Sequence, residues 1–274
     1  MNTGPTARTR LFALLGDPVE HSLSPIFQNA ALYASGIDAR YMALRCSTEA
    51  LPALLRGVAE AGGGGNITVP HKEIAMRAVD RLGDTARRTG ACNTFGFADG
   101  GIWGDNTDVE GFRRALHALL GSSSSRMRVL LVGAGGAARA AVCALLDDGA
   151  ASITVVNRSA DRAQRLAAQF GSPTSLQLAD RVPPDTFDLA VNATTLGLRA
   201  GDPLPLEPRV RAGAALDLVY TPEETPWVRR MRERGIPAAD GREMLLQQGA
   251  AAFRLWFGQE PPMDVMQRAL GLGG

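Results

Sequence analysis

A lysine and an aspartate in the first half of the chain are the residues best suited to move a proton. Lys72 stands two residues after Pro70, and Asp108 closes the run Asp105-Asn-Thr-Asp108. A lysine serves as a general acid or base when a closed site lowers its pKa, and a neighbouring carboxylate holds the ammonium and biases its protonation. Taken singly, Lys72 is more simply a surface residue and Asp108 a helix cap. We interpret them as an acid–base pair because small polar residues accompany them.

Small hydroxyl and amide side chains are concentrated at the predicted strand ends of this half. They are Ser22, Ser24, Asn66, Thr68 and Asn93. Hydroxyls and amides bind the hydroxyl groups of a sugar-like molecule, and a serine pair can hold a carboxylate. Ser24 alone is most simply a helix N-cap before Pro25. Together they predict a site for a small polyhydroxylated carboxylic acid.

An apolar run, 129–132, meets a cluster of glycines and then an alanine-rich segment. Gly133, Gly135 and Ala138 match the dinucleotide-binding pattern Gly-x-Gly-x-x-Gly/Ala. Gly133 permits a tight turn, Gly135 lets a pyrophosphate approach the backbone, and Ala138 lets the following helix pack against the strand. The N–H groups and dipole of the helix N-terminus would then face the phosphates. A purely structural glycine-rich turn is the alternative.

The end of the next predicted strand indicates which dinucleotide is bound. Asn157-Arg-Ser159 follows the β-branched run 152–156, and Arg162 lies one turn further on. An NAD site usually places an acidic residue here to hold the ribose hydroxyls, whereas a guanidinium suits a 2′-phosphate. Without the preceding glycine-rich turn, both arginines would be ordinary surface charges. We therefore predict NADP, with the acid–base pair exchanging the hydroxyl proton as hydride moves.

The composition excludes several other functions. The chain has 274 residues, 45% of them hydrophobic, and a net charge of +1 that gives no electrostatic argument for nucleic acid or an acidic membrane surface. No apolar run of about 18 residues predicts a membrane span, and residues 1–10 lack the apolar core of a signal peptide. The widely spaced cysteines predict reduced thiols in the cytoplasm. The histidines show no metal-ligand spacing, so we expect no metal.

Periodicity and turn residues predict strands alternating with helices in the first half. The strands are 10–16, 41–44 and 66–69, the helices are 25–35 and 51–61, and Pro70 opens a further helix carrying Lys72. A hairpin joins 92–97 to 101–104, because Asp99-Gly100 favours a two-residue turn. A long helix then runs to about Leu120. This alternation implies right-handed crossovers and a largely parallel sheet.

The second half continues the alternation. Its predicted strands are 129–132, 152–156, 187–191, 214–218 and 236–238, and its helices are 227–234, 241–257 and 263–270. In the helix 241–257, one face gathers Met244, Leu245, Gln248, Ala252, Leu255 and Trp256. The strands of this half are apolar enough for a buried parallel sheet.

Several ordered motifs resemble those of the shikimate dehydrogenase family, NADP-dependent enzymes of aromatic amino-acid biosynthesis. On the substrate side these are His21-Ser-Leu-Ser-Pro25, Asn66-Ile-Thr-Val-Pro-His-Lys72, Cys92-Asn-Thr94 and Gly104-Asp-Asn-Thr-Asp108. On the cofactor side they are Gly133-Ala-Gly-Gly-Ala137, Asn157-Arg-Ser159 and Asn192-Ala-Thr194. Two later segments also match, Asp217-Leu-Val-Tyr220 and 241–248. The resemblance extends from about residue 10 to residue 258.

The resemblance implies a role for each matching residue. Lys72 and Asp108 would be catalytic. The substrate would be bound by Ser22, Ser24, Thr68, Lys72, Asn93, Asp108, Tyr220 and Gln248. The cofactor would be lined by Asp84, Gly133, Ala134, Gly135, Gly136, Ala137, Asn157, Arg158, Ser159, Arg162, Thr194, Leu218 and Gly241.

The fold that the resemblance implies is α/β with two domains. Residues 1–108 and 241–274 would form the substrate-binding and catalytic domain, and 109–240 a Rossmann-like NADP-binding domain. The active site is expected where the two domains meet. We expect a cytoplasmic monomer or homodimer that reversibly reduces 3-dehydroshikimate to shikimate with NADPH.

Two departures from the family pattern leave alternatives open. Cys92 replaces the usual valine, which we interpret as a packing variation, and Val109-Glu110 follows Asp108 where the family often has a glycine. Relatives that act on quinate or on aminated analogues share most of these motifs. Ser22, Ser24 and Thr68 favour shikimate. A non-catalytic NADP-sensing module is a further alternative, against which the retained lysine and aspartate argue.

Overall fold

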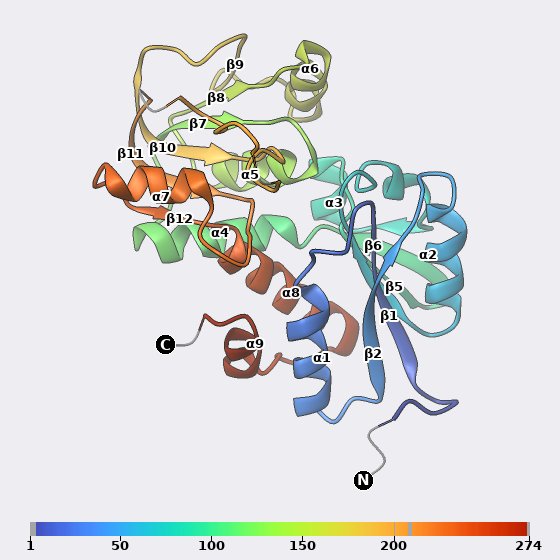
Figure 1. Cartoon of the computed structure of the whole chain (residues 1–274). Helices are drawn as coiled ribbons and strands as arrows, with labels where there is room; N and C mark the ends of the chain where they lie inside the picture. Colours follow the sequence, from blue (N-terminus) through green and yellow to red (C-terminus); the bar gives the residue numbers. More distant parts are fainter. Residues whose placement is uncertain (1–3, 200, 208–209, 273–274) are drawn as a thin grey trace. The chain divides into compact units, whose positions relative to one another are not determined.

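The computed structural model describes residues 4–199, 201–207 and 210–272. The chain forms two compact units, one made of Met1–Thr107 with Leu245–Gly274 and the other of Asp108–Met244. Each unit contains a six-stranded sheet with helices packed against it (Figure 1). The predicted α/β class is therefore confirmed.

The sheet of the first unit is mixed. Its strands are β1 (Arg10–Gly16), β2 (Ala39–Arg45), β3 (Gly64–Ile67), β4 (Arg81–Leu82), β5 (Thr94–Ala98) and β6 (Gly101–Asp105), in the order β2-β1-β3-β5-β6-β4. β2, β1 and β3 are parallel, whereas β5 runs antiparallel to both β3 and β6. The predicted hairpin causes this reversal, and its turn residues Asp99 and Gly100 have φ angles of 49° and 73°.

Helices cover both faces of this sheet. They are α1 (Ser24–Ala34), α2 (Leu51–Glu60), the 3₁₀ helix η1 (Ile74–Arg77), α3 (Asp84–Thr89), α8 (Arg242–Phe257) and α9 (Met263–Ala269). Alternate residues of β1 point to opposite faces. Phe12 and Leu14 pack in a core with α1, α8 and α9, whereas Ala13 and Leu15 pack with α2 and η1. The strand is consequently buried on both sides.

The sheet of the second unit is parallel throughout. Its strands are β7 (Arg128–Val132), β8 (Ser152–Val156), β9 (Leu176–Ala179), β10 (Thr186–Asn192), β11 (Arg211–Asp217) and β12 (Ala238–Ala239), in the order β12-β11-β10-β7-β8-β9. Its helices are α4 (Asp108–Leu120), α5 (Gly136–Asp147), α6 (Ala160–Gln169) and α7 (Pro226–Glu233). The chain runs outward from β7 to β9 and then returns to β10. Ligands of such sheets bind beyond the carboxyl ends of the strands at this reversal.

A buried carboxylate ties β10, β11 and α7 together. One oxygen of Asp217 accepts hydrogen bonds from Asn192 Nδ2 (2.8 Å) and the main-chain nitrogen of Val219 (3.0 Å). The other oxygen accepts one from Thr225 Oγ1 (2.8 Å), which also caps α7 by accepting from the nitrogen of Val228. Burial raises the pKa of Asp217 to about 6, although the three donors act in the opposite direction.

The prediction that Lys72 lies in a helix is wrong. Residues 70–73 form a turn, and η1 begins only at Ile74. The main-chain nitrogen of His71 donates to the carbonyl oxygen of Thr68 (2.9 Å), and the nitrogen of Cys92 donates to the carbonyl oxygen of Lys72 (2.8 Å). This long-range bond holds the segment beside Cys92, just before β5, which the local sequence pattern does not reveal.

Three other local predictions also need correction. Ser24 is the first residue of α1 rather than its N-cap, which is Leu23 and makes no side-chain capping hydrogen bond. β3 begins at Gly64 instead of residue 66, so its first two residues are glycines. They let the strand lie close to β1, because a Cβ at Gly65 would be only 2.0 Å from the carbonyl oxygen of Ala13. Leu255, assigned to the apolar face of α8, is 47% exposed. The sequence reading also missed four elements, β4, α3, α6 and β9.

Asp217→Asn is expected to change how stability depends on pH. In the folded state the carboxyl group of Asp217 has a pKa of about 6, whereas in the unfolded chain its pKa is about 3.9. The free energy of unfolding therefore falls as the pH rises from about 4 to about 6, and the whole penalty is present above that window. In urea unfolding, the stability of the variant relative to the wild type should rise by up to about 3 kcal/mol between pH 4 and pH 7.

Asp99→Asn is the control for this comparison, because it removes one exposed carboxylate at a turn position that asparagine also tolerates. A stability difference between Asp217→Asn and the wild type that stays constant from pH 4 to pH 7 would contradict the assignment.

Candidate active site

The loops that carry the predicted substrate residues leave one edge of the first sheet. β1, β3 and β6 end at this edge and β5 begins there, because β3 is parallel to β1 and antiparallel to β5, which is antiparallel to β6. Ser22 follows β1, Thr68 follows β3, Asn93 precedes β5, and Thr107 follows β6. The topology therefore gathers residues that are far apart in the sequence.

Main-chain contacts hold Thr68 and Lys72 at this edge. The nitrogen of Thr68 donates to the carbonyl oxygen of Leu15 (2.9 Å), at the end of β1. Gly16 leaves room for the threonine, since a Cβ there would lie 2.3 Å from Thr68 Cγ2. The carbonyl of Lys72 is bonded to the nitrogen of Cys92, the neighbour of Asn93. Both side chains are half-buried.

The amide of Asn93 makes hydrogen bonds with both its oxygen and its nitrogen at this edge. Its Oδ1 accepts from the main-chain nitrogen of Thr107 (2.7 Å) and from Thr94 Oγ1 (2.9 Å). Its Nδ2 donates to Thr107 Oγ1 (3.0 Å) and lies 3.5 Å from Gln248 Oε1. Asn93 and Gln248, which are 155 positions apart in the sequence, are both buried. The structure thus brings two predicted substrate residues together.

The two serines lie at the beginning of α1. The main-chain nitrogen of Ser24 donates to Ser22 Oγ (3.2 Å), so the two residues form one local turn. Gln28, further along α1, donates from Nε2 to the carbonyl oxygen of Gly249 in α8 (2.9 Å). This bond ties the helix that begins at Ser24 to the helix that carries Gln248.

The predicted acid–base residues belong to different units. Lys72 lies in the turn after β3, in the first unit. Asp108 is the first residue of α4, in the second unit, and it is 3% exposed. It follows Thr107 directly, and Thr107 is bonded to Asn93. The pairing of the two charged groups stays a prediction.

The glycine-rich turn after β7 has the geometry that a phosphate requires. Gly133 has a φ of 115°, and a Cβ there would lie 2.6 Å from the carbonyl oxygen of Ala193. Gly135 is the N-cap of α5, and a Cβ added to it would meet no atom within 4 Å. The backbone before the helix is therefore open to a ligand, and the first N–H groups of α5, beginning at Gly136, follow it. This arrangement fits the pyrophosphate of a dinucleotide.

The predicted 2′-phosphate residues follow β8, the strand next to β7. Ser159 caps α6 by accepting a hydrogen bond from the nitrogen of Arg162, and Asn157 Nδ2 donates to the carbonyl oxygen of Ser159 (2.8 Å). Arg158 and Arg162 are exposed. Two guanidinium groups thus stand at the beginning of α6, where a phosphate could be reached without burying either charge.

Thr194, Leu218 and Gly241 gather at the ends of β10 and β11. Thr194 Oγ1 donates to Asn192 Oδ1 (2.7 Å), and the nitrogen of Leu218 donates to the carbonyl oxygen of Asn192 (2.9 Å). Gly241 packs so closely on this corner that a Cβ would lie 2.4 Å from the carbonyl oxygen of Leu218. Because β10 neighbours β7, these residues share a sheet edge with the glycine-rich turn.

Two predicted site residues belong to the unit that does not carry most of their group. Asp84, a predicted cofactor contact, begins α3 in the first unit, and its exposed carboxylate pairs with Arg87 (2.7 Å). Tyr220, a predicted substrate contact, follows β11 in the second unit and is half-buried. A substrate or cofactor contact for either residue stays a prediction.

Sequence reasoning named Asn66 but missed Tyr41, which supports Asn93 through it. Tyr41 is buried in β2, and its hydroxyl donates to Asn66 Oδ1 (2.8 Å). Asn66 in turn donates to Thr94 Oγ1 (2.9 Å). A tyrosine at the start of the predicted strand 41–44, whose other residues are apolar, signals a hydroxyl that needs a partner, but not which partner it finds.

Other kinds of site were sought in the part of the chain that the structure describes. None of its helices is both long and apolar enough to cross a membrane. No group of three or more His, Cys, Asp or Glu side chains there could hold a metal ion. Cys46, Cys92 and Cys143 are free thiols, and all three are buried.

Three family models match successive parts of the chain. The shikimate dehydrogenase substrate binding domain matches residues 14–95, and shikimate / quinate 5-dehydrogenase matches 116–194. The shikimate 5'-dehydrogenase C-terminal domain matches 241–270. The matched segments include both the substrate-side edge and the glycine-rich turn.

Whole-chain comparisons agree with these matches. Shikimate dehydrogenase (NADP(+)) of Synechocystis sp. is 39% identical over 280 residues, which cover 97% of this chain and 96% of that protein. The crystal structure of shikimate 5-dehydrogenase from Thermus thermophilus in complex with NADP(H) and shikimate is 40% identical, with a TM-score of 0.85 over 96% of this chain and 99% of that one. Shikimate dehydrogenase from Aquifex aeolicus gives a TM-score of 0.87 at 34% identity, over 97% of this chain and 98% of that one. This chain belongs to the shikimate dehydrogenase family.

Proposed function

We propose that this protein is an NADP-dependent shikimate dehydrogenase, which reversibly reduces 3-dehydroshikimate to shikimate. Residues 1–108 and 241–274 would bind the substrate and carry the acid–base chemistry, and 109–240 would bind the cofactor. The free, buried cysteines fit a reducing compartment such as the cytoplasm. The relatives named for this activity cover nearly the whole chain.

The observation that carries the proposal is the nature and place of Lys72. It is the only lysine of the chain, in which Lys and Arg together number 29, so the other members of this set are all arginines. A guanidinium keeps its proton in proteins, whereas an amine can release one. Lys72, which carries this amine, lies in the loop after β3, and its carbonyl oxygen accepts a hydrogen bond from Cys92, the residue next to Asn93. The residue proposed to transfer the proton thus belongs to the edge that gathers the hydroxyl and amide side chains.

In the proposed reaction, bound NADPH supplies the hydride that reduces the carbonyl carbon. Lys72 donates the proton to the carbonyl oxygen and takes it back in the reverse direction, and Asp108 orients the amine. Ser22 and Ser24 hold the substrate carboxylate. Thr68, Asn93, Tyr220 and Gln248 contact the ring or its hydroxyls.

On the cofactor side, the backbone from Gly133 to Ala137 holds the pyrophosphate at the beginning of α5. Asn157, Arg158, Ser159 and Arg162 recognise the 2′-phosphate. The remaining proposed cofactor contacts are Thr194, Leu218, Gly241 and Asp84.

A turnover assay tests the function directly. Shikimate, quinate and an aminated analogue are each supplied with NADP⁺ or with NAD⁺, and reduction of the nicotinamide is followed by its absorbance. The highest kcat/KM is expected for shikimate with NADP⁺. Higher kcat/KM for quinate would reassign the substrate, and no turnover with any combination would reduce the protein to a binding module.

Replacing Lys72 tests its part in proton transfer. Lys72→Ala should lower kcat by at least about two orders of magnitude, the size of a general acid–base contribution. Lys72→Arg keeps the positive charge but cannot release a proton at neutral pH, so it should be nearly as slow. If Lys72→Arg turned over at a rate near that of the wild type, the role of the residue would be charge rather than proton transfer.

Arg158 tests the choice of cofactor. Arg158→Gln should raise the KM for NADPH much more than the KM for NADH, because only NADPH carries the 2′-phosphate that the guanidinium would bind. Arg165→Gln, on the same helix α6, removes a charge outside the proposed phosphate contacts and is the matched control. Equal effects of Arg158→Gln on both cofactors would contradict the assignment.

A further inference from the structure

The ring of Tyr41 is enclosed in the first unit, and its hydroxyl points to the substrate side. Tyr41 is 2% exposed, and its ring lies 6.1 Å from the ring of Trp256, centroid to centroid. Trp256 is itself fixed by a hydrogen bond from Nε1 to the carbonyl oxygen of Phe95 (3.0 Å). The hydroxyl donates to Asn66 Oδ1, which is also buried. The packing of the ring therefore fixes the position of the Tyr41 hydroxyl, which is the donor.

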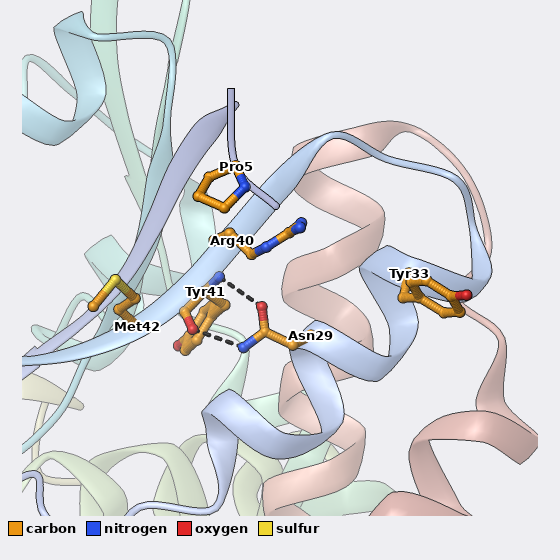
Figure 2. A pocket seen from close by; sticks show the side chains of 6 residues that line it. All are labelled: Pro5, Asn29, Tyr33, Arg40, Tyr41 and Met42. Carbon is orange, nitrogen blue, oxygen red and sulfur yellow. Dashed lines mark hydrogen bonds between the residues drawn. The ribbon is translucent and has the colours of Figure 1, made fainter. Parts of the chain in front are cut away.

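The backbone of Tyr41 is held separately by an asparagine of α1. Asn29 Nδ2 donates to the carbonyl oxygen of Tyr41 (2.8 Å), and the nitrogen of Tyr41 donates to Asn29 Oδ1 (2.9 Å) (Figure 2). Asn29 Nδ2 also donates to the carbonyl oxygen of Pro25, at the beginning of α1 (2.7 Å). β2 is an edge strand, so this side chain pairs main-chain groups that no neighbouring strand reaches. Tyr41 is thus fixed at both its backbone and its ring.

A directed chain of hydrogen bonds leads from this hydroxyl to Asn93. Because Tyr41 donates to Asn66, the amide oxygen of Asn66 faces the tyrosine and its NH₂ group faces Thr94. Asn66 Nδ2 also donates to the carbonyl oxygen of Asn93 (3.2 Å). Thr94 Oγ1 accepts from Asn66 and donates to Asn93 Oδ1 (2.9 Å). The amide orientation of one asparagine therefore constrains that of the other.

The last hydrogen bonds of this series determine whether the oxygen or the NH₂ group of the Asn93 amide faces Gln248. Its oxygen is occupied by donors from Thr94 and from the backbone of Thr107. Its NH₂ group is therefore directed toward Thr107 Oγ1 and Gln248 Oε1. If the amide turned over, its NH₂ group would face the main-chain N–H of Thr107, a donor that cannot rotate away, and the bond of 2.7 Å to the oxygen would be lost. The main-chain N–H of Thr107 and the Tyr41–Asn66–Thr94 chain, here called the relay, thus together place a hydrogen-bond donor, rather than an acceptor, on the Gln248 side.

We propose that Tyr41 is a positioning residue, which acts through Asn66 and Thr94 to hold the amide of Asn93 in the orientation that binds the substrate. This inference rests on the proposed function, in which Asn93 and Gln248 contact the substrate.

Tyr41→Phe removes only the hydroxyl and keeps the ring. The expected result is a fall of about tenfold in kcat/KM for shikimate, about the value of one buried hydrogen bond, with the KM for NADP⁺ unchanged. Tyr33→Phe is the matched control, because this tyrosine lies on α1 with 80% of its surface exposed. A kcat/KM of Tyr41→Phe within twofold of the wild type would overturn the proposal.

A double-mutant cycle separates positioning from a general loss of structure. If Tyr41 acts through Asn93, Tyr41→Phe should have no further effect on kcat/KM in the Asn93→Ala background. A second full tenfold loss in that background would overturn the proposal. Thr94→Val breaks the relay one step later and should cause a similar loss, of which Thr94→Ser, which keeps the hydroxyl, should recover most.

A readout without turnover keeps this inference distinct from the proposed function. In ¹⁵N NMR of the free protein, the side-chain NH₂ signals of Asn66 and Asn93 should shift and exchange faster in Tyr41→Phe, and unchanged signals would overturn the relay. If the wild type did not oxidise shikimate while these signals changed, the relay would stand, but the proposed function and the substrate role of Tyr41 would be overturned.

Discussion

The hydrogen bonds of the buried Asn93 amide are the interactions on which the proposed substrate-binding edge of the first unit depends. Its main-chain carbonyl accepts from β3, its side chain is bonded to Thr94 and Thr107, and Gln248 of α8 lies beside its NH₂ group. Leaving a single buried donor or acceptor of this set unpaired costs about 1–3 kcal/mol. The same bonds therefore join three separate parts of the chain and fix the geometry of the proposed site.

The cofactor side of the second unit is organised by a comparable buried group. Asp217 and Asn192 join the ends of β10 and β11, next to the glycine-rich turn after β7. Here the buried polar atoms are hydrogen-bonded to one another, whereas the elements proposed to bind the cofactor are main-chain groups and exposed arginines. The first unit instead places side-chain amides and hydroxyls at its sheet edge. This difference matches the two proposed ligands, because a pyrophosphate is bound by main-chain N–H groups and a small polyhydroxylated acid needs specific side-chain partners.

The sequence allowed prediction of features that depend on short-range rules. The glycine-rich turn, the Asp99-Gly100 hairpin and the apolar strands of the second unit are all confirmed, because a positive φ or a continuous apolar run leaves a local signature. The turn at Lys72 and the relay from Tyr41 were not predictable in this way. Each depends on a partner more than 15 positions away, such as Cys92 for Lys72 and Asn66 for Tyr41. Predicting them requires the sheet order, which no local pattern contains.

The junction between Thr107 and Asp108 connects the two halves of the proposed chemistry. Thr107 is held by Asn93, in the first unit, and Asp108 is the first residue of α4, in the second. One peptide bond places their Cα atoms about 3.8 Å apart, whatever the arrangement of the two units. The backbone of the proposed catalytic carboxylate is therefore anchored to the substrate-side network, while its helix belongs to the unit that carries the cofactor residues. This covalent neighbourhood holds Asp108 next to the substrate-side network without any contact between the two units.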